Sequence, residues 1–217
     1  NLKKVQMHFG LPVQSHLSEN QSEVAWVQEL CPQSEFYGDA YDRFGLFGAD
    51  CSTVMAHCVY SDVRERRRMK ENGVYVAHCP ESNMNLSSGI APVRAFLNEG
   101  IPVGLGSDVA GGTSEDIFAA MAHAIQASKL RWRLVDDTLK PLTAIEAFYL
   151  GTKGGGSFFG KVGSLEEGYE FDALIVDDSA ISSRDMEVKE RLERLIYLSG
   201  GAKIKGKYVA GKEIFWR

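Results

Sequence analysis

The first half of the chain contains four short, mostly apolar runs, and each ends in a residue that can bind a metal or move a proton. Near-continuous apolar runs of this length are typical of parallel strands that are buried on both faces of a sheet. We therefore predict four parallel strands that end at His16, His57, His78 and Asp108. The runs are LPVQSH (11–16), STVMAH (52–57), GVYVAH (73–78) and IPVGLGSD (101–108).

A helical pattern follows each of these runs. The helix after the second run is expected to begin at a cap formed by Ser61 or Asp62 and to stop at Gly73. A capping box predicts a further helix, because Thr143 is followed three residues later by Glu146. The predicted helices cover residues 21–30, 61–73, 91–100, 114–129 and a segment after Thr143. Pro92 lies near the start of the third helix, and Thr113 or Ser114 is expected to cap the fourth. Residues 2–12 resemble the end of a helix.

The spacing of the strand ends suggests a barrel. A (β/α)8 barrel of ~250 residues has about 31 residues in each unit, and the last two intervals between strand ends fit that repeat. The first interval is longer because residues 32–50 are inserted there. We expect this insertion to pack as a surface excursion, although its aromatic residues would also suit a cover over the barrel mouth; they are Tyr37, Tyr41, Phe44 and Phe47.

The pattern changes after the glycine-rich stretch GTKGGGSFFG (151–160). Residues 170–178 and 203–215 resemble short antiparallel strands, and a helix is expected between them over residues 185–198. The predicted fold class is therefore α/β, with four strands of a barrel over residues 1–160 and a small β domain over residues 161–217.

Composition narrows the possible functions. Charged residues make up 24% of the chain and the net charge is −5, which disfavours a nucleic-acid surface because phosphate binding requires a basic stripe. No apolar run approaches the ~18 residues of a membrane span, and nothing resembles a signal peptide. The four cysteines form no CxxC pair and fit reduced thiols. We expect a cytoplasmic protein without membrane or nucleic-acid partners, and the absence of an initiator Met suggests a missing upstream segment.

Active sites of barrels lie at the carboxyl ends of the strands, which is where His16, His57, His78 and Asp108 fall. A single histidine at a strand end is usually structural, but four such residues in consecutive units favour a site. Glu19 follows His16 by three residues and is either a second acid over the barrel mouth or a cap of the next helix. His8 and His123 lie in predicted helices and are expected to be structural or exposed.

Four stretches of the chain resemble the second half of the amidohydrolase superfamily: VQSHLSEN, TVMAHC, VAHCPESNMNLSSG and VGLGSDVAGGTS. Within that superfamily, the combination of HLSEN with DVAGG is similar to the guanine deaminases. The resemblance covers nearly the whole chain. It implies the C-terminal half of a (β/α)8 barrel, zinc as the cofactor with one ion per site, and guanine and water as substrates.

The resemblance also implies a role for each site residue. His16 would bind zinc and contact the substrate, and Asp108 would bind zinc and accept a proton from the attacking water. Glu19 would bind the substrate and shuttle protons, and His57 would hydrogen-bond the attacking water. His78 and Asn83 would support substrate binding. The implied reaction is hydrolytic deamination of guanine to xanthine and ammonia.

Two features depart from the family pattern. The His-x-His pair of its first barrel strand does not occur here, so the remaining zinc ligands are expected from a missing N-terminal half of the same protein. Cys58 stands where a glycine is common, and we expect little consequence. We also expect a homodimer, although the sequence does not determine the oligomeric state.

Three other interpretations remain. A related zinc aminohydrolase would act on a triazine, a pterin or a modified purine. A non-catalytic relative would use the fold as a scaffold, but such relatives typically lose the metal-site residues that this chain retains. A free-standing β/α domain is disfavoured because half a barrel leaves two open sheet edges.

Overall fold

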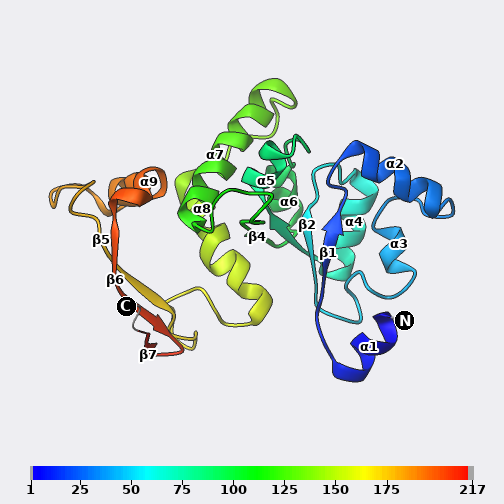
Figure 1. The fold of residues 1–217 in the computed structure, drawn as a ribbon, viewed down its shortest axis with the longest axis horizontal. Coiled ribbons are helices and arrows are strands. Elements are labelled where there is room, and N and C mark those ends of the chain that lie inside the picture. The colour runs from blue at the N-terminus through cyan, green and yellow to red at the C-terminus, as the bar shows by residue number, and fades with distance from the viewer. Residues whose placement is uncertain (1, 215–217) are drawn as a thin grey trace.

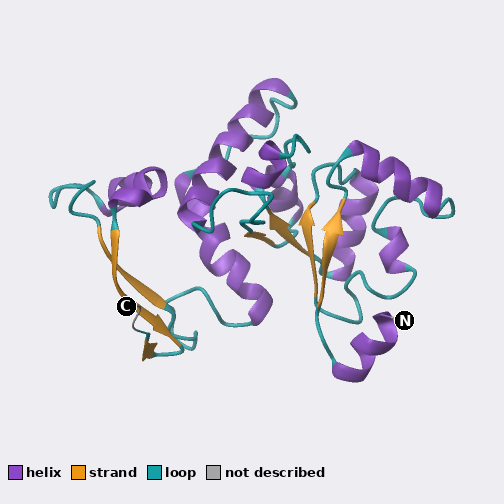
Figure 2. Cartoon of the chain, viewed as in Figure 1, coloured by secondary structure: helices purple, strands orange, loops and turns teal. Residues whose placement is uncertain are grey.

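The computed structural model describes residues 2–214, and its strands form two separate sheets (Figures 1 and 2). The first sheet is parallel, in the order β1 (Val13–Leu17), β2 (Thr53–His57), β3 (Tyr75–His78) and β4 (Val103–Leu105). The second is antiparallel, in the order β5 (Ala173–Asp177), β6 (Lys203–Val209) and β7 (Lys212–Glu213). Both predicted sets of strands are therefore present.

Helices connect the strands of the first sheet and cover one of its faces. The connections contain α2 (Gln21–Leu30), α3 (Asp39–Asp42), α4 (Val63–Asn72), α5 (Pro80–Asn85) and α6 (Val93–Glu99). Helix α1 (Leu2–Phe9) precedes β1, and α7 (Ile117–Leu134) and α8 (Ala144–Tyr149) follow β4. A π-helical turn η1 (Leu150–Gly154), 3-10 turns at Ser157–Phe159 and Ser199–Gly201, and α9 (Val188–Leu198) complete the described elements.

The helix ends follow the capping residues of the sequence. Asp62 caps α4 by accepting hydrogen bonds from two backbone amides, and Gly73 ends the helix in the left-handed conformation. Thr143 and Glu146 form the predicted capping box of α8. The prediction for α7 was wrong in detail, because the helix begins three residues late and Asp116, rather than Thr113 or Ser114, accepts the capping hydrogen bond.

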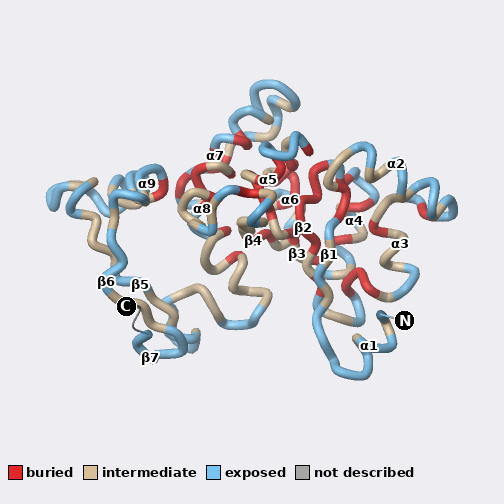
Figure 3. The backbone as a smooth tube through the Cα atoms, in the orientation of Figure 1, coloured by how far each residue is buried: buried red, intermediate tan, exposed pale blue. Residues whose placement is uncertain are grey.

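The main core lies between the first sheet and helices α4, α6, α7 and α8. Figure 3 shows that the buried chain is concentrated there, while α1 and the second sheet are mostly exposed. Helix α9 follows the second sheet's first strand in sequence, yet its Ile196 is buried in the main core and the helix packs against α7 and α8. The proposed boundary at residue 160 therefore does not separate every packing contact, and the division into 1–160 and 161–217 stays a prediction.

The inserted segment 32–50 packs beside β1 and α4. Phe47 is fully buried, Tyr37 and Tyr41 pack against the core, and Phe44 is exposed. The Tyr41 hydroxyl lies 2.8 Å from Ser15 Oγ, on the strand itself. These contacts agree with the expected surface excursion.

Within residues 2–214, none of the helices combines the length and the apolar character that a bilayer-spanning segment requires.

Candidate active site

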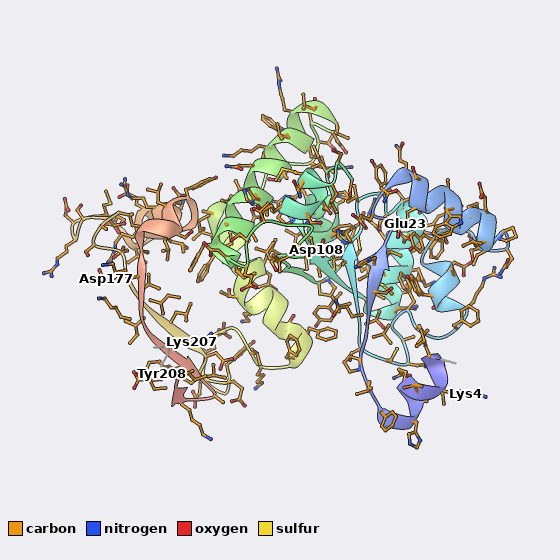
Figure 4. All side chains as sticks on the ribbon, in the orientation of Figure 1. Lys4, Glu23, Asp108, Asp177, Lys207 and Tyr208 are labelled. Atoms are coloured by element: carbon orange, nitrogen blue, oxygen red, sulfur yellow. The ribbon has the colours of Figure 1, made fainter. Side chains whose placement is uncertain are left out.

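The parallel register brings the predicted strand-end residues to one edge of the first sheet. Leu17, which follows His16, pairs with His57, the last residue of β2. His78 is the last residue of β3 and pairs with Leu105, which ends β4. Asp108 lies three residues beyond that strand, in its exit loop, so the prediction that it closes the strand was wrong by three residues. Figure 4 shows Asp108 beside the strands of this sheet.

Three of the predicted site residues form one cluster of possible ligand atoms. Atoms of His16, Glu19 and His57 all lie within 4.8 Å of one another. The imidazole rings of His16 and His57 meet edge to face, with 5.1 Å between their centroids. His16 is exposed and His57 is buried, so the cluster reaches from the core to the open edge of β1. Imidazole nitrogens and carboxylate oxygens are the ordinary ligands of zinc in proteins.

His57 is the central group of the site, and its side chain is only 1% exposed. Its Nε2 atom lies 3.8 Å from Glu19 Oε2 and 3.9 Å from Asp108 Oδ2. Its Nδ1 atom lies 2.9 Å from Asn83 Oδ1. Asn83 therefore fixes the orientation of the ring from behind, while two carboxylates face its other nitrogen. The hydrogen bond that one ring nitrogen of a histidine makes determines which of its two nitrogens carries the proton.

Helix α5 and the loop that follows it hold both carboxylates in place. Ser88 donates a hydrogen bond of 2.8 Å to Glu19 Oε1, and Ser82 donates one of 2.5 Å to Asp108 Oδ2. Sequence reasoning missed both serines, although they belong to the same stretch as His78 and Asn83. Their burial next to the site was the missing information, because Ser82 and Ser88 are almost fully inaccessible.

His78 is almost fully buried, like His57. Burial, and secondly the nearby charge of His57, lower its pKa to about 3, so the ring is neutral near pH 7. Its Nδ1 atom is buried and finds no hydrogen-bond partner among the described residues, and neither does Asn83 Nδ2. Buried polar atoms are rarely left unpaired in native structures. These two atoms are therefore available to a water molecule or another polar group in the site.

Backbone conformations that are uncommon outside glycine also cluster at this edge. Ser18, His57, Cys58 and Asp108 all have positive φ angles, which are uncommon outside glycine. Such residues cluster at functional sites because the surrounding contacts must hold them there. Gly111 is required for a related reason, since a Cβ atom at that position would lie 2.8 Å from Asp108 Oδ2.

Two histidines lie apart from the cluster. His8 is on α1, where its ring packs on Phe9. His123 is on α7, with its Nδ1 atom 4.0 Å from Glu81 Oε2. Their positions on helices agree with the prediction that they stand away from the strand ends.

Comparison with known proteins identifies the family. The amidohydrolase family profile matches residues 1–214. This chain belongs to the amidohydrolase family. The match confirms the resemblance drawn from the strand-end motifs.

The similar members of the family include several guanine deaminases. The crystal structure of guanine deaminase from C. acetobutylicum, which has guanine bound in its active site, shares 50% identity and superposes with a TM-score of 0.93 over 99% of this chain and 51% of that chain. Guanine deaminase from Pongo abelii is 37% identical over 99% of this chain and 49% of its own length. An adenosine deaminase from Xanthomonas campestris with bound zinc is 27% identical, with a TM-score of 0.81, over 97% of this chain and 47% of that chain. The chain thus spans about half the length of these amidohydrolase relatives.

Proposed function

We propose that this chain is the C-terminal half of a zinc-dependent guanine deaminase, which hydrolyses guanine to xanthine and ammonia. The observation that carries the proposal is the meeting of Glu19 and Asp108 around His57 Nε2, at the carboxyl edge of a parallel sheet. The choice of guanine rests on the similarity to guanine deaminases, including one with guanine bound. A non-catalytic scaffold would have no need for His16 and two partly buried acids at one edge.

The residues present fit a zinc ion only in part. His16 and Asp108 are the proposed ligands from this chain, and the donor atoms of His16, Glu19 and His57 are close enough to surround a cation. Catalytic zinc usually has three protein ligands and an open position. The remaining ligands would come from a His-x-His pair in the N-terminal half, which would also close the barrel. When bound, zinc lowers the pKa of a coordinated water from 15.7 to about 7.

The chain's own residues divide the proton transfers. Asp108 accepts a proton from the water whose oxygen forms a bond to C2 of guanine. Glu19 protonates ring N3, takes up the second proton of the attacking oxygen as the C2 carbonyl forms, and passes it to the amino nitrogen as its bond to C2 breaks. The proton held by Asp108 then returns to Glu19, which restores both groups. His57, held by Asn83, directs Nε2 at the same space and donates a hydrogen bond to the attacking oxygen when that nitrogen carries a proton. General acid–base groups placed in this way typically contribute 10²–10⁴-fold each.

A substrate panel tests the proposed activity. The full-length enzyme that contains this chain is expected to release ammonia from guanine far faster than from adenine, cytosine or melamine, measured as kcat/KM under identical conditions. Adenosine and a pterin belong in the same panel, because relatives act on other heterocycles. A preference for any of these compounds over guanine would refute the substrate assignment while leaving the aminohydrolase chemistry intact.

Removal of the Asp108 carboxylate should reduce turnover and metal binding together. In the full-length enzyme we expect Asp108→Ala to lower kcat about 10²-fold and to reduce the zinc content after dialysis. Asp137→Ala provides a matched control, because Asp137 is exposed beyond the end of α7. Full activity and full zinc occupancy in the Asp108 variant would show that Asp108 neither binds zinc nor accepts the proton of the attacking water.

The homodimer and the cytoplasmic location stay predictions. Size-exclusion chromatography with light scattering on the full-length enzyme measures the first, and fractionation of the source cells measures the second.

A further inference from the structure

A buried acid outside the proposed mechanism lies behind the site. Glu65, on α4, has only 1% of its surface exposed. Ser18 Oγ donates a hydrogen bond of 2.8 Å to its Oε2 atom, and the Gly38 amide donates one of 2.7 Å to its Oε1 atom. Burial raises the pKa of this carboxyl group. Burying a carboxyl group has a free-energy cost, so this acid requires an explanation.

Ser18 connects this acid to the site. It lies between Leu17, at the end of β1, and Glu19, and its side chain is buried. Its φ angle of 46° places the backbone in the left-handed region, which a serine adopts only when surrounding contacts hold it. The Ser18 carbonyl accepts a hydrogen bond of 2.9 Å from the Tyr60 amide, and the Ser18 hydroxyl is held by Glu65. This turn sets the direction in which Glu19 leaves the strand.

The inserted segment 32–50 supports the same turn through a second acid. The Tyr37 hydroxyl donates to Glu23 Oε1 at 2.8 Å, and Glu23 Oε2 accepts from the Glu19 amide at 2.9 Å. Glu23 lies in the first turn of α2, and Figure 4 shows it apart from Asp108. Residues 37 and 38 of the insertion therefore reach Glu19 and Ser18 through two different carboxylates.

We propose that Glu65 is a positioning residue that acts through Ser18 to aim the Glu19 carboxylate at His57 and Ser88. The inference rests on the proposed function, in which Glu19 carries the proton. Without Glu65, the Ser18 hydroxyl and the Gly38 amide lose their buried acceptors, and the turn is free to relax toward an ordinary conformation. A displacement of about 1 Å at a catalytic group is enough to reduce the rate about 10²-fold.

Two substitutions in the full-length enzyme separate positioning from charge. Glu65→Leu removes both hydrogen bonds at similar volume, and we expect kcat for guanine to fall about 10- to 10²-fold with KM and zinc content within about threefold of wild type. Glu65→Gln keeps one acceptor for Gly38 and offers an amide donor to the Ser18 oxygen. Its kcat should therefore stay within about fivefold of wild type.

A double-mutant cycle tests the connection through Ser18. Ser18→Ala should reproduce most of the loss in kcat, and adding Glu65→Leu to Ser18→Ala should change kcat by less than about threefold. Independent, multiplicative losses would overturn the inference, as would a Glu65→Leu enzyme with wild-type turnover. If Glu65→Leu does not fold, Ser18→Ala with unchanged kcat would overturn it instead.

Asn72→Leu is the matched control for a loosened insertion. Asn72 is also on α4, and it donates hydrogen bonds to Asp42 and to the Phe47 carbonyl, both in residues 32–50. This variant should lower the melting temperature while kcat remains within about threefold of wild type. Equal losses of kcat in the Asn72 and Glu65 variants would reduce Glu65 to a stabilising residue. A wild-type enzyme that releases no ammonia from guanine would refute the proposed function separately.

Discussion

The Glu19→Gln variant of the full-length enzyme is expected to lose about 10²–10⁴-fold in kcat and to retain its zinc. The amide keeps the shape of the side chain and can still accept the hydrogen bond that Ser88 donates to Glu19. It cannot exchange a proton with the substrate near neutral pH, and this loss alone should account for the fall in kcat. Steady-state ammonia release and metal analysis of the same preparation measure the two quantities.

Glu29→Gln is the control for that variant. Glu29 is exposed on α2, the helix that follows Glu19 in sequence, so the same chemical change should leave kcat unaltered. Turnover of the Glu19 variant at the wild-type level would reduce Glu19 to a residue of the turn before α2. Loss of zinc together with activity would instead make Glu19 a metal ligand, which its distance to His16 and His57 also permits.

The strands of the first sheet were predictable because each is a short run of mostly apolar residues. A parallel strand in this position needs a run of apolar residues. The polar residue that follows such a run is therefore easily recognised in the sequence. His57 and His78 end their strands as predicted. The helix caps were predictable for a similar reason, since the Thr143 side chain bonds a backbone group only three residues away.

The π-helical turn η1 was not predictable from local preference. Its stretch is rich in glycine, which disfavours helices, and in the sequence it marks only a change of pattern. The structure shows that close packing on β4 requires those glycines. A Cβ atom on Gly154 would lie 2.8 Å from the Val103 carbonyl, and one on Gly104 would lie 2.7 Å from the Gly155 Cα atom. The tertiary contact therefore overrides the local preference.

The residues of the candidate site divide in the same way, into those that a local pattern predicts and those that depend on contacts distant in sequence. His57 and His78 end their strands, whereas β1 continues one residue past His16 and Asp108 lies three residues after β4. A pattern that is local in sequence still locates all four residues. Ser82 and Ser88 act on carboxylates that are 26 and 69 residues away in sequence, and no local pattern encodes such pairs. Glu65 is a further example, because α4 reads as an exposed, charged helix in sequence, with three arginines directly after that acid.

Residues 1–217 expressed alone are expected to be inactive and to self-associate. In the described part of the first sheet, β1 and β4 each pair on one side only, and unpaired strand edges invite association with another chain. One face of this sheet is also partly open. Gln14, Val54, Tyr75 and Phe158 line a cavity of about 390 Å³ there, which the other strands of a closed barrel would fill.

Coexpression with the proposed N-terminal half should reverse this behaviour. The added strands would pair with β1 and β4, cover the open face and supply the His-x-His pair, so guanine deamination with zinc present should rise from background to a measurable rate. An N-terminal half in which both histidines of that pair are changed to alanine is the matched control. It should restore a soluble complex without activity, because the barrel closes while the zinc ligands are absent. A monomeric, zinc-loaded and active 217-residue chain would show that the sheet is complete by itself and that His16 and Asp108 suffice to hold the metal.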